Sequence, residues 1–360
     1  MPRRPAALTL VTVLGARPQF VKASPLSRAL RSRHREVIVH TGQHYDPDMS
    51  AVFFDELAIP LPDHHLGVGG GSHGAQTGAM LAMLEPVLDK KRPDAVVVVG
   101  DTNSTLAGAL AAAKLGIPVA HVEAGLRSFD RTMPEAINRL VVDRLSTWLF
   151  APSESSRRRL SAEGIVAGVH VVGDVMLDAL TLHRSRALAS GALDRLGLQP
   201  GGYHLATVHR AANTDDQARL RAILAGLGAL DRPVILPLHP RTRRRIADFG
   251  LDLSAGVRAV EPQGYLDMLA LTAAAACVLT DSGGVQREAY YLAVPCVTLR
   301  DETEWTETVA TGWNTLAGAD ADRIVAAVAA RPTGKAPHPE LYGDGRAAER
   351  IAAILAGETP

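Results

Sequence analysis

The strongest constraint on this chain is a regular alternation of short apolar runs with helical patterns, from one end to the other. The apolar runs are predicted strands, at residues 8–14, 37–40, 95–99, 119–122, 148–150, 204–208, 234–238, 257–260, 277–279 and 296–299. Helical patterns fill the intervals, for example at 103–114, 135–145, 215–227 and 282–292. Apolar strands that alternate with helices are typical of parallel sheets covered on both faces. We therefore predict an α/β fold of the doubly wound kind.

The stretch 173–202 divides the predicted strands into two groups. It is helical and polar, it ends in a Pro-Gly-Gly sequence, and a new strand follows it. A chain of 360 residues is also long enough for two domains of ordinary size. We predict two Rossmann-like domains, residues 1–175 and 176–345, with the active site in the cleft between them.

The composition argues against nucleic acid or a membrane as a partner and favours a cytoplasmic location. Thirty-eight basic residues balance thirty-eight acidic ones, so no overall field favours nucleic acid or an anionic membrane. The two cysteines, Cys277 and Cys296, lie inside apolar runs, as packed and reduced thiols of a cytoplasmic protein do. The first residues resemble a short signal peptide, but the run 8–14 leads into a helical pattern, and we interpret it as a strand. No stretch has the length of a transmembrane helix.

Charged side chains gather where the predicted strands of the first half end: Arg17, Lys22, Asp101, Glu123, Glu135 and Arg139. Taken singly, some have plain structural explanations. Asp101 could cap the next helix, and Glu135 is placed where a helix dipole favours a carboxylate. Together, however, crowded carboxylates raise one another's pKa values, which is costly unless proton transfer or ligand binding uses them. We therefore predict a functional cluster.

The second half offers a complementary set of residues. His209 ends one strand, and Ser282, Gly283 and Gly284 stand where another strand passes into a helix. A helix N-terminus approached over glycines is a ready anion site, although many such turns bind nothing. With His209 nearby we predict a diphosphate there, and Glu288 could accept hydrogen bonds from a ribose.

Nine separated motifs, in order, carry a resemblance over nearly the whole chain: GARPQFVKASPL, TGQHYD, PDAVVVVGDTNSTLAGALAA, PVAHVEAGLRS, MPEAINR, TVHR, LPLHP, LTDSGGVQREA and YGDG. With these motifs the chain resembles the non-hydrolysing UDP-N-acetylglucosamine 2-epimerases. The resemblance implies the two-domain architecture of B-type glycosyltransferases, with the helix at 346–360 packed back on the first domain. It also implies a cytoplasmic homodimer that needs no cofactor and no metal.

The reaction implied by the resemblance is a reversible inversion at C2 of a UDP-sugar. The C2 proton is removed as UDP leaves C1, which gives a 2-acetamidoglucal, and both then return. By the same resemblance Asp101, Glu123 and Glu135 are the acid/base carboxylates, and His209 joins them in the catalytic set. The expected substrate-binding residues are Arg17, Lys22, Arg139, Gln263, Met268, Ser282, Gly283, Gly284 and Glu288, with Gln263 and Met268 at the uracil.

Departures from the common family pattern leave the substrate open. Gln43 and His44 are retained, but the glycine-rich stretch 66–78 puts the activator site of many bacterial members in doubt. Trp305 stands where the common pattern has an arginine. These features resemble the branch that acts on UDP-2,3-diacetamido-glucuronate, which is the alternative to UDP-N-acetylglucosamine. Hydrolysis to free N-acetylmannosamine is an alternative of another class, whereas glycosyl transfer or a sensor role would not need the carboxylates.

Overall fold

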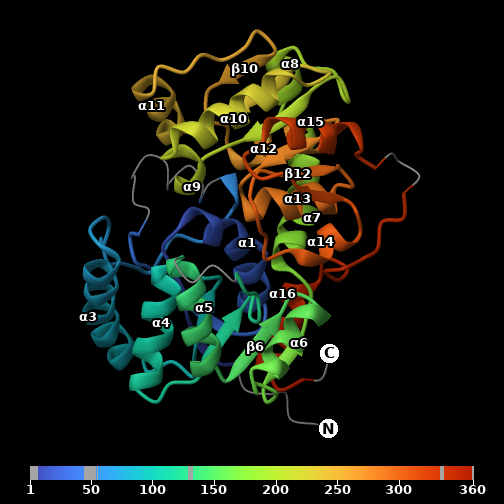
Figure 1. Ribbon diagram of the computed structural model, residues 1–360. Coiled ribbons are helices and arrows are strands. Elements are labelled where there is room, and N and C mark those ends of the chain that lie inside the picture. The colour runs from blue at the N-terminus through green and yellow to red at the C-terminus, as the bar shows by residue number, and fades with distance from the viewer. Residues whose placement is uncertain (1–6, 44–53, 55, 129–132, 333–335, 359–360) are drawn as a thin grey trace. The chain divides into compact units, whose positions relative to one another are not determined.

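The computed structural model describes residues 7–43, 54, 56–128, 133–332 and 336–358. Contacts within the chain divide it into two compact units (Figure 1). Unit 1 comprises Met1–Leu182 and Glu340–Pro360, and unit 2 comprises His183–Pro339. The domain boundaries expected after residues 175 and 345 stay a prediction.

Unit 1 is built on a parallel sheet in the order β3-β2-β1-β4-β5-β6-β7. Its strands are β1 (Thr9–Leu14), β2 (Arg35–His40), β3 (His64–His65), β4 (Ala95–Val99), β5 (Val119–Val122), β6 (Trp148–Ala151) and β7 (Val169–Val171). The inner strands β4 and β5 are buried along their whole length and are mostly apolar, as expected for a parallel sheet with helices on both faces. The strand expected at 8–14 is confirmed, since β1 pairs with β2 and β4 near the centre of the sheet.

The helices of unit 1 are α1 (Arg17–Arg31), α3 (His73–Lys91), α4 (Asn103–Lys114), α5 (Pro134–Leu145), α6 (Glu154–Ala162), α7 (Val175–Leu188), which runs on into unit 2, and α16 (Ala347–Leu355). Local signals set their ends. Thr102 caps α4 by accepting a hydrogen bond from the backbone N–H of Thr105, as an N-cap threonine should. Helices α3, α4 and α5 lie side by side (Figure 1), and α16 packs against α1.

Unit 2 repeats the same plan with the strand order β10-β9-β8-β11-β12-β13. Its strands are β8 (His204–Thr207), β9 (Val234–Pro237), β10 (Val257–Val260), β11 (Val278–Thr280), β12 (Cys296–Thr298) and β13 (Asn314–Leu316). Its helices are α8 (Ala192–Leu196), α9 (Ala211–Thr214), α10 (Gln217–Gly228), α11 (Pro240–Asp248), α12 (Tyr265–Ala274), α13 (Gly283–Tyr291), α14 (Thr306–Ala310) and α15 (Ala321–Ala329). In both units every recorded strand pairing is parallel.

The structure confirms the α/β class and all ten predicted strands, and it adds β3, β7 and β13. These three strands have the sequences His-His, Val-His-Val and Asn-Thr-Leu, so none of them forms the apolar run that marks the other strands in the sequence. Cys277 and Cys296 are buried free thiols, as expected. In the part of the chain that is described, no helix combines the length and the apolar character needed to cross a bilayer.

A buried histidine makes the stability of unit 1 depend on pH. His40 ends β2, is 1% exposed, and stacks on His65 with the ring centroids 4.7 Å apart. Burial, followed by the neighbouring His65, lowers the pKa of His40 from 6.5 to about 4. The unfolded chain therefore binds this proton more tightly than the folded chain does. The stability that neutral His40 contributes is present above pH 6.5 and is lost as the pH falls toward 4.

We expect this group to lower the free energy of unfolding by about 2 kcal/mol between about pH 7.5 and about pH 5. Urea denaturation at the two pH values measures the change. His40→Phe, which keeps an aromatic ring beside Phe20 and His65, should remove this part of the pH dependence. An equal loss in the wild type and the variant would contradict the assignment to His40.

Candidate active site

Asp101 stands at the turn from β4 to α4. Gly100 makes this turn with a φ of 72°, a value that glycine adopts without strain. The Asp101 carboxylate is 29% exposed, and its Oδ2 atom lies 2.7 Å from Nη2 and 3.0 Å from Nε of Arg139. Asn138 donates a hydrogen bond to the Asp101 carbonyl at 2.8 Å. Among the described residues, Oδ1 of Asp101 has no recorded partner, so this oxygen is open to a ligand.

Glu123 follows β5 and is held more tightly than Asp101. Its φ is 77°, which is uncommon for a residue with a side chain and is often found at functional sites. The carboxylate is 3% exposed, and both of its oxygens are paired. Nζ of Lys22 on α1 lies 2.5 Å from Oε2, and Nη2 of Arg139 lies 3.1 Å from Oε1. Arg139 therefore contacts both carboxylates.

The other residues predicted for unit 1 either form no hydrogen bond or ion pair with this cluster or have side chains outside the described structure. Glu135 is exposed on the first turn of α5 and makes no hydrogen bond or ion pair with any described residue. Arg17 begins α1, but its side chain lies outside the described part of the chain. The structure thus brings together Lys22, Asp101, Glu123 and Arg139.

The residues retained from the activator motif are only partly described. Oε1 of Gln43 accepts hydrogen bonds from the backbone N–H and the hydroxyl of Ser104, at 3.1 and 2.7 Å. His44 lies outside the described residues. The side chain of Gln43 therefore fastens the chain after β2 to the start of α4.

In unit 2 a buried carboxylate, which we did not predict from the sequence, orients His209. Asp281 is fully buried at the end of β11 and accepts hydrogen bonds from the backbone N–H groups of His209 and Arg210. Its Oδ1 atom also lies 2.9 Å from Nδ1 of His209. Burial alone would raise the pKa of Asp281, but the hydrogen bonds and charge of His209 hold it below its usual value. Because Nδ1 is engaged, Nε2 of His209 is the nitrogen available to a ligand.

The turn after Asp281 begins α13, and its two glycines have different surroundings. Ser282 caps the helix, and the backbone N–H groups of Gly283 and Gly284 have no recorded acceptor among the described residues. A Cβ atom at Gly283 would collide with the carboxylate of Glu304 and lie 3.2 Å from Nε1 of Trp305. At Gly284 the nearest atom would be Oγ of Ser282, at an ordinary 3.7 Å. The first glycine therefore admits a protein loop, and only the second leaves open space for an anion.

The remaining predicted residues of unit 2 belong to α12, to the segment before it, and to α13. Glu288 is 7% exposed on α13. Gln263 precedes α12 and donates a hydrogen bond to the carbonyl of Glu261 at 2.6 Å. Met268 on α12 is half-buried and packs against a core that includes Tyr203. Their contacts with a nucleotide stay a prediction.

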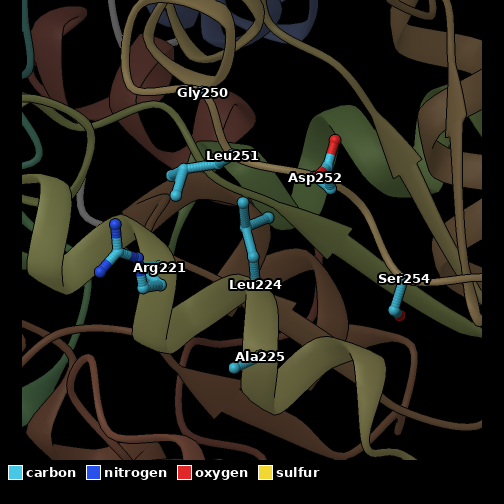
Figure 2. Close-up of a pocket in the computed structure, with 7 residues that line it drawn as sticks. All are labelled: Arg221, Leu224, Ala225, Gly250, Leu251, Asp252 and Ser254. Atoms are coloured by element: carbon cyan, nitrogen blue, oxygen red, sulfur yellow. The ribbon is translucent and has the colours of Figure 1, made fainter.

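One shallow pocket in unit 2 lies away from these residues. Arg221 and Leu224 of α10 line one side of it, and Leu251 and Asp252 line the other (Figure 2). The segment with Leu251 leads into β10 at its amino end. His209 and Asp281 instead follow the carboxyl ends of β8 and β11, where ligands of open α/β sheets bind. We assign this pocket no part in the site.

Comparison with known proteins identifies the family. The model of the family described as UDP-N-acetylglucosamine 2-epimerase matches residues 28–356. This chain belongs to that family. A Methanococcus maripaludis protein named as a homolog of UDP-N-acetylglucosamine 2-epimerase is 47% identical over 354 residues, which are 97% of this chain and 99% of the relative.

Two further members of the family bear on the substrate and the fold. The UDP-2,3-diacetamido-2,3-dideoxy-D-glucuronate 2-epimerase of Pseudomonas aeruginosa is 48% identical over 360 residues, 97% of this chain and 99% of the relative. The UDP-GlcNAc 2-epimerase of Methanocaldococcus jannaschii, crystallised with UDP-GlcNAc and UDP, is 44% identical. It superimposes with a TM-score of 0.91 over 97% of this chain and 100% of its own. The fold is therefore that of these epimerases.

The different surroundings of the two glycines give a paired prediction. Gly283→Ala should lower the free energy of unfolding by about 1–3 kcal/mol, because the methyl group overpacks the contact with Glu304 and Trp305. Gly284→Ala should leave it unchanged or raise it by up to about 1 kcal/mol, because alanine is the better helix residue. Urea denaturation of both variants measures the difference. Equal destabilisation would show that packing does not distinguish the two positions.

Proposed function

We propose that this chain catalyses the reversible C2 epimerisation of UDP-N-acetylglucosamine to UDP-N-acetylmannosamine. The observation that carries the proposal is the charged cluster of Asp101, Glu123, Arg139 and Lys22, in a chain 44% identical to an epimerase crystallised with UDP-GlcNAc. Two carboxylates and two cations give proton transfer and charge stabilisation in one place.

Asp101 is the best-placed base in this cluster. It is the more exposed carboxylate, and one of its oxygens is open, whereas both oxygens of Glu123 are paired with cations. In the proposed reaction Asp101 takes the proton from C2 while the C1–O bond breaks. The electron pair of the C–H bond forms the C1=C2 double bond, and the electrons of the C1–O bond leave with UDP. Protonation of C2 on the opposite face, which uses the electron pair of the double bond, and return of the UDP oxygen to C1, which re-forms the C1–O bond, complete the inversion.

The leaving diphosphate is assigned to unit 2. The N–H groups at the start of α13, over Gly284, suit an oxyanion. Nε2 of His209, oriented by the contact of Nδ1 with Asp281, faces the ligand and donates a further hydrogen bond when both ring nitrogens carry a proton. Glu288 for the ribose and Gln263 with Met268 for the uracil complete the proposed nucleotide site, and Arg17 and Glu135 keep their proposed roles in substrate binding and acid/base work.

UDP-2,3-diacetamido-2,3-dideoxy-D-glucuronate is the second candidate substrate. The relative named for that activity is 48% identical and matches 97% of this chain, so the same cluster would act on a sugar with other groups at C3 and C6. We further propose that the protein is a homodimer in the cytoplasm. The exposed apolar residues Met83, Ile137 and Val141 on α3 and α5 are of the kind that a second copy covers.

Proton NMR in deuterated water tests the reaction. With UDP-N-acetylglucosamine we expect deuterium at C2 and a stable mixture of two UDP-sugars. Exchange only with the diacetamido-glucuronate nucleotide would transfer the assignment to that substrate. Free N-acetylmannosamine with UDP would indicate hydrolysis, and no exchange with either nucleotide would refute the proposed epimerisation.

Replacement of the proposed base separates chemistry from binding. Asp101→Asn should reduce the rate of deuterium exchange by at least about 100-fold, because an amide cannot take the proton. UDP affinity, measured by isothermal titration calorimetry, should change little, since UDP is assigned to unit 2. Asp89→Asn, on the exposed surface of α3, is the matched control and should keep the wild-type rate. Loss of UDP binding in Asp101→Asn would show that its role is not that of the base.

A further inference from the structure

We propose that His121 and Asp143 are positioning residues. Through hydrogen bonds to the backbone they fix the turn that carries Asp101, after β4, and the turn that carries Glu123, after β5. The inference rests on the proposed function, since it concerns the geometry of those two carboxylates. Neither residue faces the open side of the cluster. His121, on β5, is 0% exposed, and Asp143, on α5, is 1% exposed. They act through the backbone of the two turns, as the following contacts show.

His121 links the two turns through its two ring nitrogens. Nε2 lies 2.8 Å from the carbonyl oxygen of Gly100, the residue directly before Asp101. Nδ1 lies 2.7 Å from Oδ1 of Asp143. A carbonyl oxygen and the oxygens of an ionised carboxylate accept hydrogen bonds but cannot donate them. Each ring nitrogen of His121 therefore faces an oxygen acceptor, and the side chain links the two turns.

Asp143 is ionised because of the donors around it. Besides His121, it accepts hydrogen bonds from the backbone N–H of Gly125 at 3.2 Å and from Nη1 of Arg127 at 2.6 Å. Burial alone would raise the pKa of Asp143, but the charges and hydrogen bonds of His121 and Arg127 hold it below its usual value. Arg127 is itself fixed by Glu163, at 2.6 Å. The carboxylate thus binds three donors that surround the Glu123 turn.

Helix α5 consequently contacts the same two turns through two of its residues, Arg139 and Asp143. Arg139 contacts the side chains of Asp101 and Glu123. Asp143, one helical turn later, contacts the backbone after Glu123 directly and the backbone before Asp101 through His121. The uncommon φ of Glu123 needs such support, because an isolated residue would leave that conformation. A loss of this support should misplace the carboxylates without removing them.

Two replacements of His121 each keep one of its two hydrogen bonds and remove the other. The side-chain amide of asparagine reaches the position of Nδ1, and the side-chain amide of glutamine reaches the position of Nε2. His121→Asn should therefore lose the bond to Gly100, and kcat should fall by on the order of 10-fold to 100-fold. KM and UDP affinity should stay within about 3-fold of the wild type, since substrate binding is not touched. His121→Gln, which keeps the Gly100 bond, should lose less of kcat.

A kinetic isotope effect distinguishes misplacement from general weakening of the fold. With substrate deuterated at C2, the isotope effect on kcat should rise in His121→Asn, because proton abstraction becomes slower relative to the other steps. The matched control is His204→Asn, which changes another fully buried histidine, paired with Asp231 at 2.8 Å in unit 2. It should lower the melting temperature but leave kcat and the isotope effect unchanged.

The experiments distinguish a failure of this inference from a failure of the proposed function. An unchanged kcat in folded His121→Asn would overturn it, and so would equal losses of kcat in His121→Asn and His204→Asn without a rise in the isotope effect. If His121→Asn does not fold, Arg127→Lys carries the test, with an expected loss of about 10-fold in kcat at unchanged KM; full activity in that variant would overturn the inference. Absence of deuterium exchange in the wild type would refute the proposed function instead.

Discussion

The structure of the site depends on one guanidinium group shared by two carboxylates. Arg139 contacts Asp101 and Glu123 while it is almost completely buried, and Lys22 completes the set. Two positive and two negative charges balance, which a buried cluster needs because an unpaired charge in a protein interior is costly. The elements that carry these residues, α1, β4, β5 and α5, must therefore keep a fixed arrangement. The parallel sheet provides it, since the ends of β4 and β5 are neighbours.

In each unit a buried carboxylate organises backbone next to residues that we assign to the substrate. In unit 1 Asp143 accepts from Gly125, His121 and Arg127. In unit 2 Asp281 accepts from the backbone of His209 and Arg210 and from the His209 ring. A carboxylate has two oxygens with several acceptor positions, so one side chain can fix a whole loop. The exposed groups of each turn then need little reorganisation when they meet a ligand.

The sequence predicts the sheets well because most inner strands are apolar runs such as β4. It also predicts α4 at its true ends, although the residue that caps this helix is Thr102 and not Asp101. Asp101 and Glu123 can also be placed at one edge, since the carboxyl ends of adjacent parallel strands meet there. Which oxygens are paired cannot be predicted, because that depends on side-chain geometry between α1 and α5. Asp143 was missed for a related reason: a charged residue in a helical pattern has the signature of a solvated face, yet it is buried here.

The surroundings of Gly283 also bear on how this sequence can vary. A glycine in a turn that precedes a helix suggests a ligand, but here its missing side chain makes room for Glu304 and Trp305. Trp305 in turn lies under the guanidinium of Arg287, 4.0 Å from the ring centroid. The residues at positions 283, 287, 304 and 305 therefore pack together. A substitution at one of these positions changes which side chains fit at the other three. Transplanting the Ser-Gly-Gly turn alone into another protein would carry over the glycine without the loop that requires it.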